Sequence, residues 1–173
     1  MPAANQAFTE ELTDTYTYEA YPLGTLRYQS PSEVFRANNT HFGERTWVFV
    51  HNDEGGSLVV GDIIEMGNDA GNGTSGYSPY RAVQSNTSAA IQYRILGVAA
   101  HTIADGAYGW IVAQGMCEVK GSSATITEGE AIVSNTAGQA KDLADGEEAS
   151  VIGMAHENDA GADALFTCYI SAL

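Results

Sequence analysis

From residue 46 onward, short apolar stretches alternate with turn sequences rich in glycine and acidic residues. The stretches are rich in β-branched, aromatic and aliphatic residues, as strands are, and they lie at 46–51, 58–66, 90–100, 107–119, 125–127, 131–136, 138–141, 149–155 and 164–171. Asp-Gly pairs at 105–106 and 145–146 supply the positive φ that tight turns need. No segment keeps a helical period over more than a short stretch, the best candidate being 31–37. The pattern predicts an all-β fold.

One motif occurs twice. A Gly-acid pair opens an apolar strand at 61–62 and again at 129–130, and a later apolar strand is broken by a central glycine, Gly97 or Gly153. What recurs is turn glycine and core aliphatic residues, which is typical of a duplicated scaffold. We therefore predict a compact β-barrel-like body built from two related β-units. The predicted core contains the aliphatic residues of the repeated strands: Ile63, Ile64, Ile95, Leu96, Val98, Ile132, Val151 and Ile152.

The two units differ in length at one place. The segment 67–80 contains four glycines and a proline and belongs to the first unit only. Insertions in repeated units map to exposed loops, often on a contacting face, so we predict an extended surface loop that carries Tyr77 and Tyr80.

Residues 1–45 show no sustained period and are predicted to form a long extended N-terminal arm, with the barrel-like domain at 46–173. The arm carries Tyr16, Tyr18, Tyr21 and Tyr28. A tyrosine ring gains free energy only when its apolar face is covered, so the arm should lie on a surface. That surface could belong to the same subunit, a neighbouring subunit or a larger assembly. We expect the body to stay folded without residues 1–30.

The charge excludes two classes of partner. Seven basic residues against 22 acidic ones leave a net charge of −15, which repels nucleic acid and anionic membranes alike. No basic and apolar leader and no apolar run of roughly 18 residues is present, so we expect synthesis and folding in a cytosol, with no membrane and no nucleic acid as partner.

Motifs of enzyme chemistry are missing from the sequence. His101 and His156 occupy nearly matching places in the two units, but strand ends commonly carry histidine without a metal. The acidic clusters at 53–54, 145–148 and 157–163 lack the order of a calcium loop and are better explained as solvated turns. Cys117 and Cys168 lie inside apolar strands and are predicted to be buried thiols. We expect no catalytic residue, no metal and no cofactor.

The motifs Gly-Asp-Ile-Ile at 61–64, Ile-Leu-Gly-Val-Ala at 95–99, Tyr-Gly-Trp-Ile-Val-Ala-Gln-Gly at 108–115, Thr-Glu-Gly-Glu-Ala-Ile at 127–132 and Val-Ile-Gly-Met-Ala at 151–155 follow in this order. Over residues 57–173 the chain thereby resembles the head decoration, or cement, proteins of tailed bacteriophages. The resemblance implies a compact β-barrel-like body, trimers on the outer capsid surface at local threefold positions, and an N-terminal arm that pairs with capsid protein. The long arm and the 67–80 segment depart from the family pattern.

Together these features predict a structural protein on the exterior of a virion, not an enzyme, that binds the major capsid protein as a homotrimer and stabilises the shell. Its predicted capsid contacts are Tyr16, Tyr18, Tyr21 and Tyr28. The alternative is a carbohydrate- or receptor-binding β-module that uses Trp110, or Tyr77 and Tyr80, as a stacking platform. Trp110 lies in an apolar run, which favours a core position and the first hypothesis.

Overall fold

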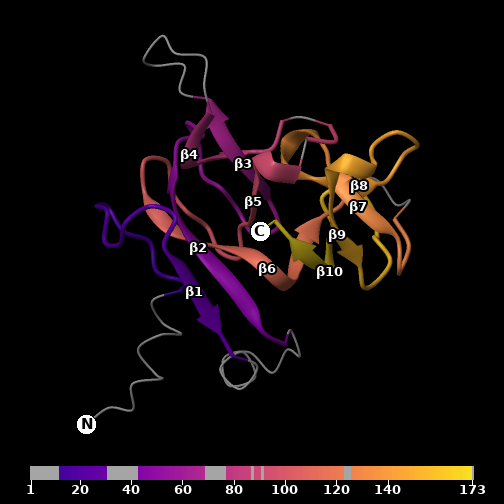
Figure 1. The fold of residues 1–173 in the computed structure, drawn as a ribbon, viewed down its shortest axis with the longest axis horizontal. Coiled ribbons are helices and arrows are strands. Elements are labelled where there is room, and N and C mark those ends of the chain that lie inside the picture. Colours follow the sequence, from indigo (N-terminus) through magenta and orange to yellow (C-terminus); the bar gives the residue numbers. More distant parts are fainter. Residues whose placement is uncertain are drawn as a thin grey trace.

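The computed structural model describes residues 12–30, 43–68, 77–86, 88–90, 92–122 and 126–172. Ten strands of these residues form one continuous sheet in the order β1-β2-β4-β3-β5-β6-β10-β9-β7-β8 (Figure 1). They are β1 (Leu26–Gln29), β2 (Arg45–Asn52), β3 (Ile63–Asn68), β4 (Tyr77–Gln84), β5 (Ile95–Val98), β6 (Tyr108–Lys120), β7 (Ala131–Ser134), β8 (Ala140–Asp142), β9 (Val151–Ala155) and β10 (Leu165–Ser171). The described residues also contain three single-turn 3-10 helices: η2 (Gln92–Arg94), η3 (Thr136–Gly138) and η4 (Glu148–Ser150). The predicted all-β class is confirmed, and none of the helices in the described part of the chain is long and apolar enough to cross a membrane.

Five of the strands close into a first small barrel, called barrel 1. β2 pairs with β6 along one edge and in parallel with β4 along the other, and β3 and β5 complete the ring. Alternate residues of these strands point inward, as a strand period of two requires. The interior is filled by aliphatic side chains: Val48, Val50, Leu58, Ile64, Ala82, Leu96, Ala99, Ile103, Ala107, Ile111 and Ala113.

The same long strand opens a second barrel, called barrel 2. The C-terminal half of β6 pairs with β10, and β9, β7 and β8 follow. A parallel bridge between Gly121 and Ala140 joins the end of β6 back to β8 and closes the ring. Figure 1 shows β7–β10, in orange to yellow, on one side of β6 and β1–β5 on the other. Barrel 2 is filled by Cys117, Val119, Ile126, Ile132, Ala140, Ile152, Ala155, Phe166, Cys168 and Ile170.

The predicted duplication is visible in the strand register. Ile64 pairs with Gly97 in barrel 1 and Ile132 pairs with Gly153 in barrel 2, and in both barrels a bulge follows directly. The backbone of β6 lies very close to Gly97, and that of β10 lies very close to Gly153. An added Cβ would be about 2 Å from a carbonyl oxygen of that strand in each case. The β-barrel-like body built from two related units is therefore confirmed at the level of individual pairs.

The Gly-acid turns repeat as well. The amides of Gly61 and Gly129 each donate to an alanine carbonyl at 2.9 Å. The carboxylates of Asp62 and Glu130 each accept, at 2.8 Å, from the amide three residues earlier. Both glycines have φ near +86°, a conformation that other residues seldom adopt. The pair therefore recurs because the turn needs a glycine for its backbone and an acid to satisfy its own amide.

Polar contacts fix the junction of the two barrels. The Lys120 ammonium lies 2.6 Å from the Asp62 carboxylate, which is fully buried. The Gly138 amide donates to the Ser85 carbonyl at 2.8 Å, and the Ala172 amide donates to Ala113 at 2.9 Å. The barrels therefore form one body with β6 as their common strand.

Most of the predicted core is confirmed, with two differences. All eight predicted residues are buried except Val151, which is partly exposed. The segment 67–80 is shorter as a loop than predicted, because β3 extends to Asn68 and β4 begins at Tyr77, and these two residues pair. Residues 69–76 and the helical candidate at 31–37 lie outside the described residues.

Candidate partner-binding surface

The described part of the arm crosses the outer face of barrel 1. Tyr16 exchanges two backbone hydrogen bonds with Tyr108 of β6, at 2.9 and 2.8 Å. Further along, the Gly24 amide donates to the Phe49 carbonyl at 2.9 Å, and the Phe49 amide donates to Thr25 at 3.0 Å. The chain then continues as β1, antiparallel to β2. Residues 12–29 therefore cross β6 and β2 and are bound to both strands by backbone hydrogen bonds.

Two of the four arm tyrosines pack against the body of the protein. The Tyr21 ring lies 5.3 Å from Phe49 and 5.2 Å from Trp110, measured between ring centroids, and the Tyr16 ring lies 5.9 Å from Phe49. Leu12 is buried in the same cluster. Such ring contacts add to the hydrophobic gain of burial. Tyr16 and Tyr21 thus already contact the protein's own body.

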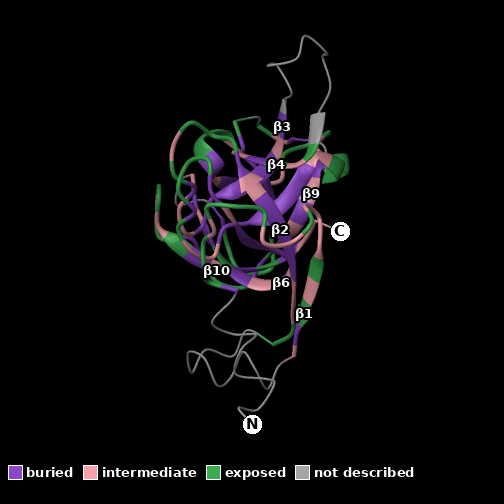
Figure 2. Cartoon of the chain, turned by 90° about the vertical axis from the view of Figure 1, so that its left-hand side faces the viewer, coloured by how far each residue is buried: buried purple, intermediate pink, exposed green. Residues whose placement is uncertain are grey.

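The other two tyrosines face outward. Tyr18 is 66 % exposed and Tyr28 is 63 % exposed. On β1, Tyr28 and Leu26 point away from the body, whereas Arg27 and Gln29 point toward it, as the strand period of two requires. The Gln29 side chain accepts from the Trp47 indole at 2.9 Å, and the Arg27 guanidinium lies over Tyr21. β1 thus carries exposed large apolar side chains on its outer face. Figure 2 colours exposed parts of this strand green.

We call Tyr18, Leu26 and Tyr28 the arm patch. β1 is the end strand of the sheet among the described strands, so its outer edge has no strand partner there. An end strand can accept a strand of another chain through its backbone, while adjacent side chains fit pockets on that chain. The Tyr28 hydroxyl donates to the Glu44 carboxylate. This hydrogen bond, with smaller contributions from burial and the Glu44 charge, raises the pKa of Tyr28.

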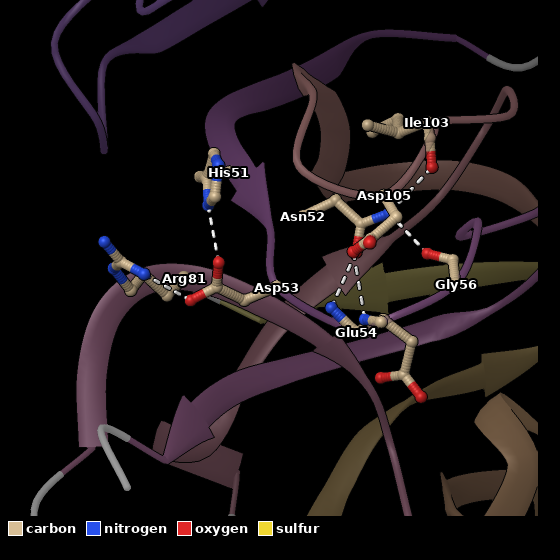
Figure 3. A network of polar contacts seen from close by, with 9 residues as sticks. His51, Asn52, Asp53, Glu54, Gly56, Arg81, Ile103 and Asp105 are labelled. Atoms are coloured by element: carbon tan, nitrogen blue, oxygen red, sulfur yellow. Dashed lines mark hydrogen bonds and ion pairs between the residues drawn. The ribbon is translucent and has the colours of Figure 1, made fainter. Parts of the chain in front are cut away.

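A polar network holds the C-terminal end of β2 (Figure 3). The Asp53 carboxylate contacts His51 Nδ1 at 2.8 Å and the Arg81 guanidinium of β4 at 2.5 Å. The fully buried Asn52 donates to the Ile103 carbonyl at 2.8 Å. The Asp53–Arg81 ion pair thus joins the end of β2 to β4 beside their parallel contact.

All basic residues of the described chain contact other groups of the protein. Each one makes an ion pair, a hydrogen bond or a contact with an aromatic ring: Arg27, Arg45, Arg81, Arg94, Lys120 and Lys141. Arg81, Arg94, Lys120 and Lys141 are paired with carboxylates, so the described cations offer no basic surface against the net charge of −15.

The structure places the residues of the alternative hypothesis differently. Trp110 is fully buried, as the sequence predicted, and offers no stacking platform. Tyr80 belongs to β4 and is half-buried; an added Cβ on Gly24 of the arm would lie 2.4 Å from its ring. The Tyr77 side chain lies outside the described residues. The burial of Trp110 removes it from the alternative hypothesis, and the platform of Tyr77 and Tyr80 stays a prediction.

The groups weighed for metal binding do not come together. No three His, Cys, Asp or Glu residues of the described ranges are arranged to hold a metal ion. Cys117 and Cys168 face each other across β6 and β10 and are both buried, as predicted. Burial, with a smaller contribution from the Cys117 contact, raises the pKa of the Cys168 thiol. Both thiols therefore serve as packing groups.

His101 is partly buried at the turn that precedes β6, and neither of its ring nitrogens has a hydrogen-bond partner among the described residues. Burial lowers the pKa of His101 to about 4, although the nearby charge of Asp14 acts in the opposite direction. The unfolded chain therefore takes up this proton first, so stability is full above about pH 6.5 and falls as the pH drops toward 4. The loss attributable to His101 is at most about 3 kcal/mol.

The variant His101→Gln should show a smaller loss of stability between pH 7 and pH 4.5 than the parent, because its amide does not titrate. Urea midpoints at the two pH values measure this difference. His156→Gln serves as the control, since His156 is exposed and the variant should behave as the parent. Identical acid sensitivity in the parent and His101→Gln would contradict the expected effect of burial.

A family model described as phage cement protein matches residues 69–171 of this chain, from the β3–β4 connection to the last residue of β10. This chain belongs to the phage cement protein family. It is accordingly a structural, capsid-associated protein of the virion. The resemblance inferred from the repeated motifs is confirmed, and the match includes all of barrel 2.

A solved structure has the same fold. The crystal structure of the N base of head fiber gp8.5 from bacteriophage phi29 aligns with a TM-score of 0.52 and 17 % sequence identity, over 73 % of this chain and 95 % of that chain. The search of curated proteins found no match. The family model begins at residue 69, so the arm and the strands β1, β2 and β3 lie outside the region that it matches.

Sequence reasoning missed two features of the surface. Leu26 was not singled out, although its alternation with Arg27 in a short strand is a signal of an outward position. Met154 and Tyr169 stand side by side on the outside of barrel 2 and are 54 % and 42 % exposed. Their strands read as apolar, and only the register shows which apolar residues face outward.

Proposed function

We propose that this cement protein binds the outer surface of a phage capsid as a homotrimer, contacts the major capsid protein through the arm patch, and stabilises the shell. In this proposal Tyr18, Leu26 and Tyr28 contact the capsid directly. Tyr16 and Tyr21 act by holding the arm on barrel 1 in the conformation that presents the patch.

The observation that carries this proposal is the division of the arm into two faces. Tyr21 and Arg27 lie against Trp110, while Tyr28 on the same stretch of chain is 63 % exposed. An exposed tyrosine on a support that is already ordered loses little conformational entropy when it binds, which is why such residues are frequent anchors at interfaces. The patch is therefore pre-organised for a partner.

The rest of the molecule fits a stabilising role without chemistry. Two closed barrels that share a strand form a stiff body, and a surface with net charge −15 keeps exposed faces soluble. A cement protein needs to bridge capsid subunits and has no need of a catalytic centre. We accordingly infer that the protein is not an enzyme, that it uses no cofactor, and that it acts on the virion exterior after synthesis in the host cytoplasm.

The test compares exposed and buried tyrosines of the same arm. Tyr18→Ala/Tyr28→Ala should weaken binding to undecorated capsids by about 100-fold, because two aromatic anchors are removed. The urea midpoint should stay at the parent value, since both rings are exposed. Cosedimentation with capsids over a range of protein concentrations measures the affinity.

Tyr93→Ala is the matched control, because Tyr93 is equally exposed, at 64 %, but lies on η2 outside the arm. It should bind capsids as the parent does. Undiminished capsid binding by the Tyr18→Ala/Tyr28→Ala variant would place attachment elsewhere on the surface.

A further inference from the structure

A row of apolar and aromatic side chains, two of them exposed and two partly exposed, crosses the outer face of barrel 2. Cross-strand pairing aligns Met116 of β6 with Tyr169 of β10, Tyr169 with Met154 of β9, and Met154 with Ala131 of β7. Met154 and Tyr169 are 54 % and 42 % exposed. We call these four residues the barrel 2 row.

Barrel 1 contains the counterpart of this row. There the same strand positions pair Trp47 of β2 with Val112 of β6, Val112 with Val98 of β5, and Val98 with Ile63 of β3. A bulge lies next to Gly97 in barrel 1 and next to Gly153 in barrel 2. When these two bulges are aligned, the paired residues of the two barrels correspond one to one. Each residue of the barrel 2 row therefore has one partner position in barrel 1.

The two rows differ in what covers them. Trp47 is 3 % exposed and Ile63, Val98 and Val112 are 0 % exposed. They belong to one cluster with residues of the arm and with the interior residues of barrel 2. The protein's own segments thus cover this face in barrel 1, whereas no described residue covers it to the same degree in barrel 2.

Charge limits what can bind there. Copies of a chain with net charge −15 repel one another, so contact between them needs a face on which few charges are desolvated. All four residues of the barrel 2 row are uncharged. Methionine and tyrosine also suit such a contact, since both give large apolar area with adaptable or amphipathic character.

We propose that the barrel 2 row is the contact through which one copy of this protein binds a second copy. The argument is that the equivalent face of barrel 1 accepts segments of this same chain, and that the row has no charge to oppose a like-charged partner. This inference rests on the homotrimer of the proposed function, to which it assigns a surface. In a ring of three copies the contact is heterologous, so the row meets a different surface of the neighbour.

The first experiment measures mass in solution without capsids. The parent should sediment at three times the chain mass of 18.3 kDa. Met154→Asp/Tyr169→Asp should sediment as a single chain at concentrations where the parent is assembled, a shift of at least about 100-fold in the dissociation constant, because two desolvated carboxylates oppose the contact. Tyr93→Asp, which adds one charge at an exposed tyrosine outside the row, should keep the parent mass.

A second measurement does not depend on the stability of the charged variant. A photo-crosslinking phenylalanine derivative at position 169 keeps an aromatic ring in the row and should give a product of twice the chain mass on illumination. The same derivative at position 93 should give none. A single-chain mass for the parent, or a product at neither position, would overturn the assignment.

The outcomes separate this inference from the proposed function. If the doubly charged variant keeps the parent mass but no longer binds capsids, the row contacts the shell, and the self-contact is refuted while capsid binding stands. If the charged variant is a single chain and Tyr18→Ala/Tyr28→Ala still binds capsids fully, the self-contact stands and the arm patch is refuted as the attachment site.

Discussion

Gly153→Ala is expected to lower the free energy of unfolding by about 3 kcal/mol, and Gly97→Ala by a similar amount. A Cβ at Gly153 would lie 2.1 Å from the Tyr169 carbonyl oxygen, and a Cβ at Gly97 would lie 2.2 Å from the Val112 carbonyl oxygen. Both contacts are with backbone, which can retreat only if the strand pairs β9–β10 or β5–β6 separate. Gly97 also has a φ of +147°, which a residue with a side chain rarely adopts.

The measurement is the urea midpoint of each variant. Gly56→Ala is the matched control, because an added Cβ there would meet nothing within 4 Å and its φ is not in the positive range. Its midpoint should stay near the parent value. If Gly153→Ala unfolded at the same urea concentration as Gly56→Ala, the close approach of β9 and β10 at this glycine would not exist.

These glycines also show why the duplication could be predicted from the sequence. The backbone places a hard limit on the side chain at Gly97 and Gly153, and turn geometry does so at Gly61 and Gly129. Such limits act at single positions, so the same residue type, glycine, is required at equivalent positions of both units. Fold class and the two β-units were therefore predictable from one chain without any comparison.

The arm was harder to predict for a physical reason. Tyr18 and Tyr21 have the same chemistry and lie three residues apart, yet one is exposed and the other packs between Phe49 and Trp110. Which ring turns inward depends on how the arm crosses β2 and β6, and these strands are distant in sequence. The hydrophobic pattern of the arm therefore does not show where it crosses these strands.

The same packing changes one expectation about the arm. Removal of residues 1–30 would delete β1 and uncover Phe49 and Trp110, which Tyr16 and Tyr21 now contact. The loss of that cover is unfavourable, since buried aromatic area dominates core energetics. Substitution of the two exposed tyrosines is therefore a cleaner test of attachment than truncation.

The barrel 2 row could not be predicted from the apolar pattern either. Residues 151–155 read as a buried strand, and the sequence gives no reason to separate Met154 from Ile152. In the structure Ile152 fills barrel 2 and Met154 faces outward beside Tyr169. The assignment follows from register, which a bulge shifts by one residue.

Lys120→Met should be among the most destabilising changes on this protein, at about 3–5 kcal/mol. The Lys120 ammonium lies 2.6 Å from the carboxylate of Asp62, which is 0 % exposed. Methionine keeps most of the length of the side chain but removes the charge. The Asp62 carboxylate would then remain buried with only the Val59 amide as a described donor, at 2.8 Å. A buried charge without its counterion is more costly than the loss of a surface ion pair.

The double variant Asp62→Asn/Lys120→Met separates this cause from a loss of packing. Asparagine retains an oxygen that can accept the Val59 amide and carries no charge, so the double variant should recover a large part of the stability lost by Lys120→Met. Lys141→Met is the control, because Lys141 and its partner Glu147 are both partly exposed and an ion pair at the surface contributes little to stability. Urea midpoints of the parent and of these three variants measure the differences. Lys120 ends β6 and Asp62 precedes β3, so their contact lies at the junction of the barrels. Recovery in the double variant would show that this contact stabilises the protein by compensating the buried charge of Asp62. Equal stability of the single and double variants would mean that the packing of the lysine stem, rather than its charge, holds the two barrels together.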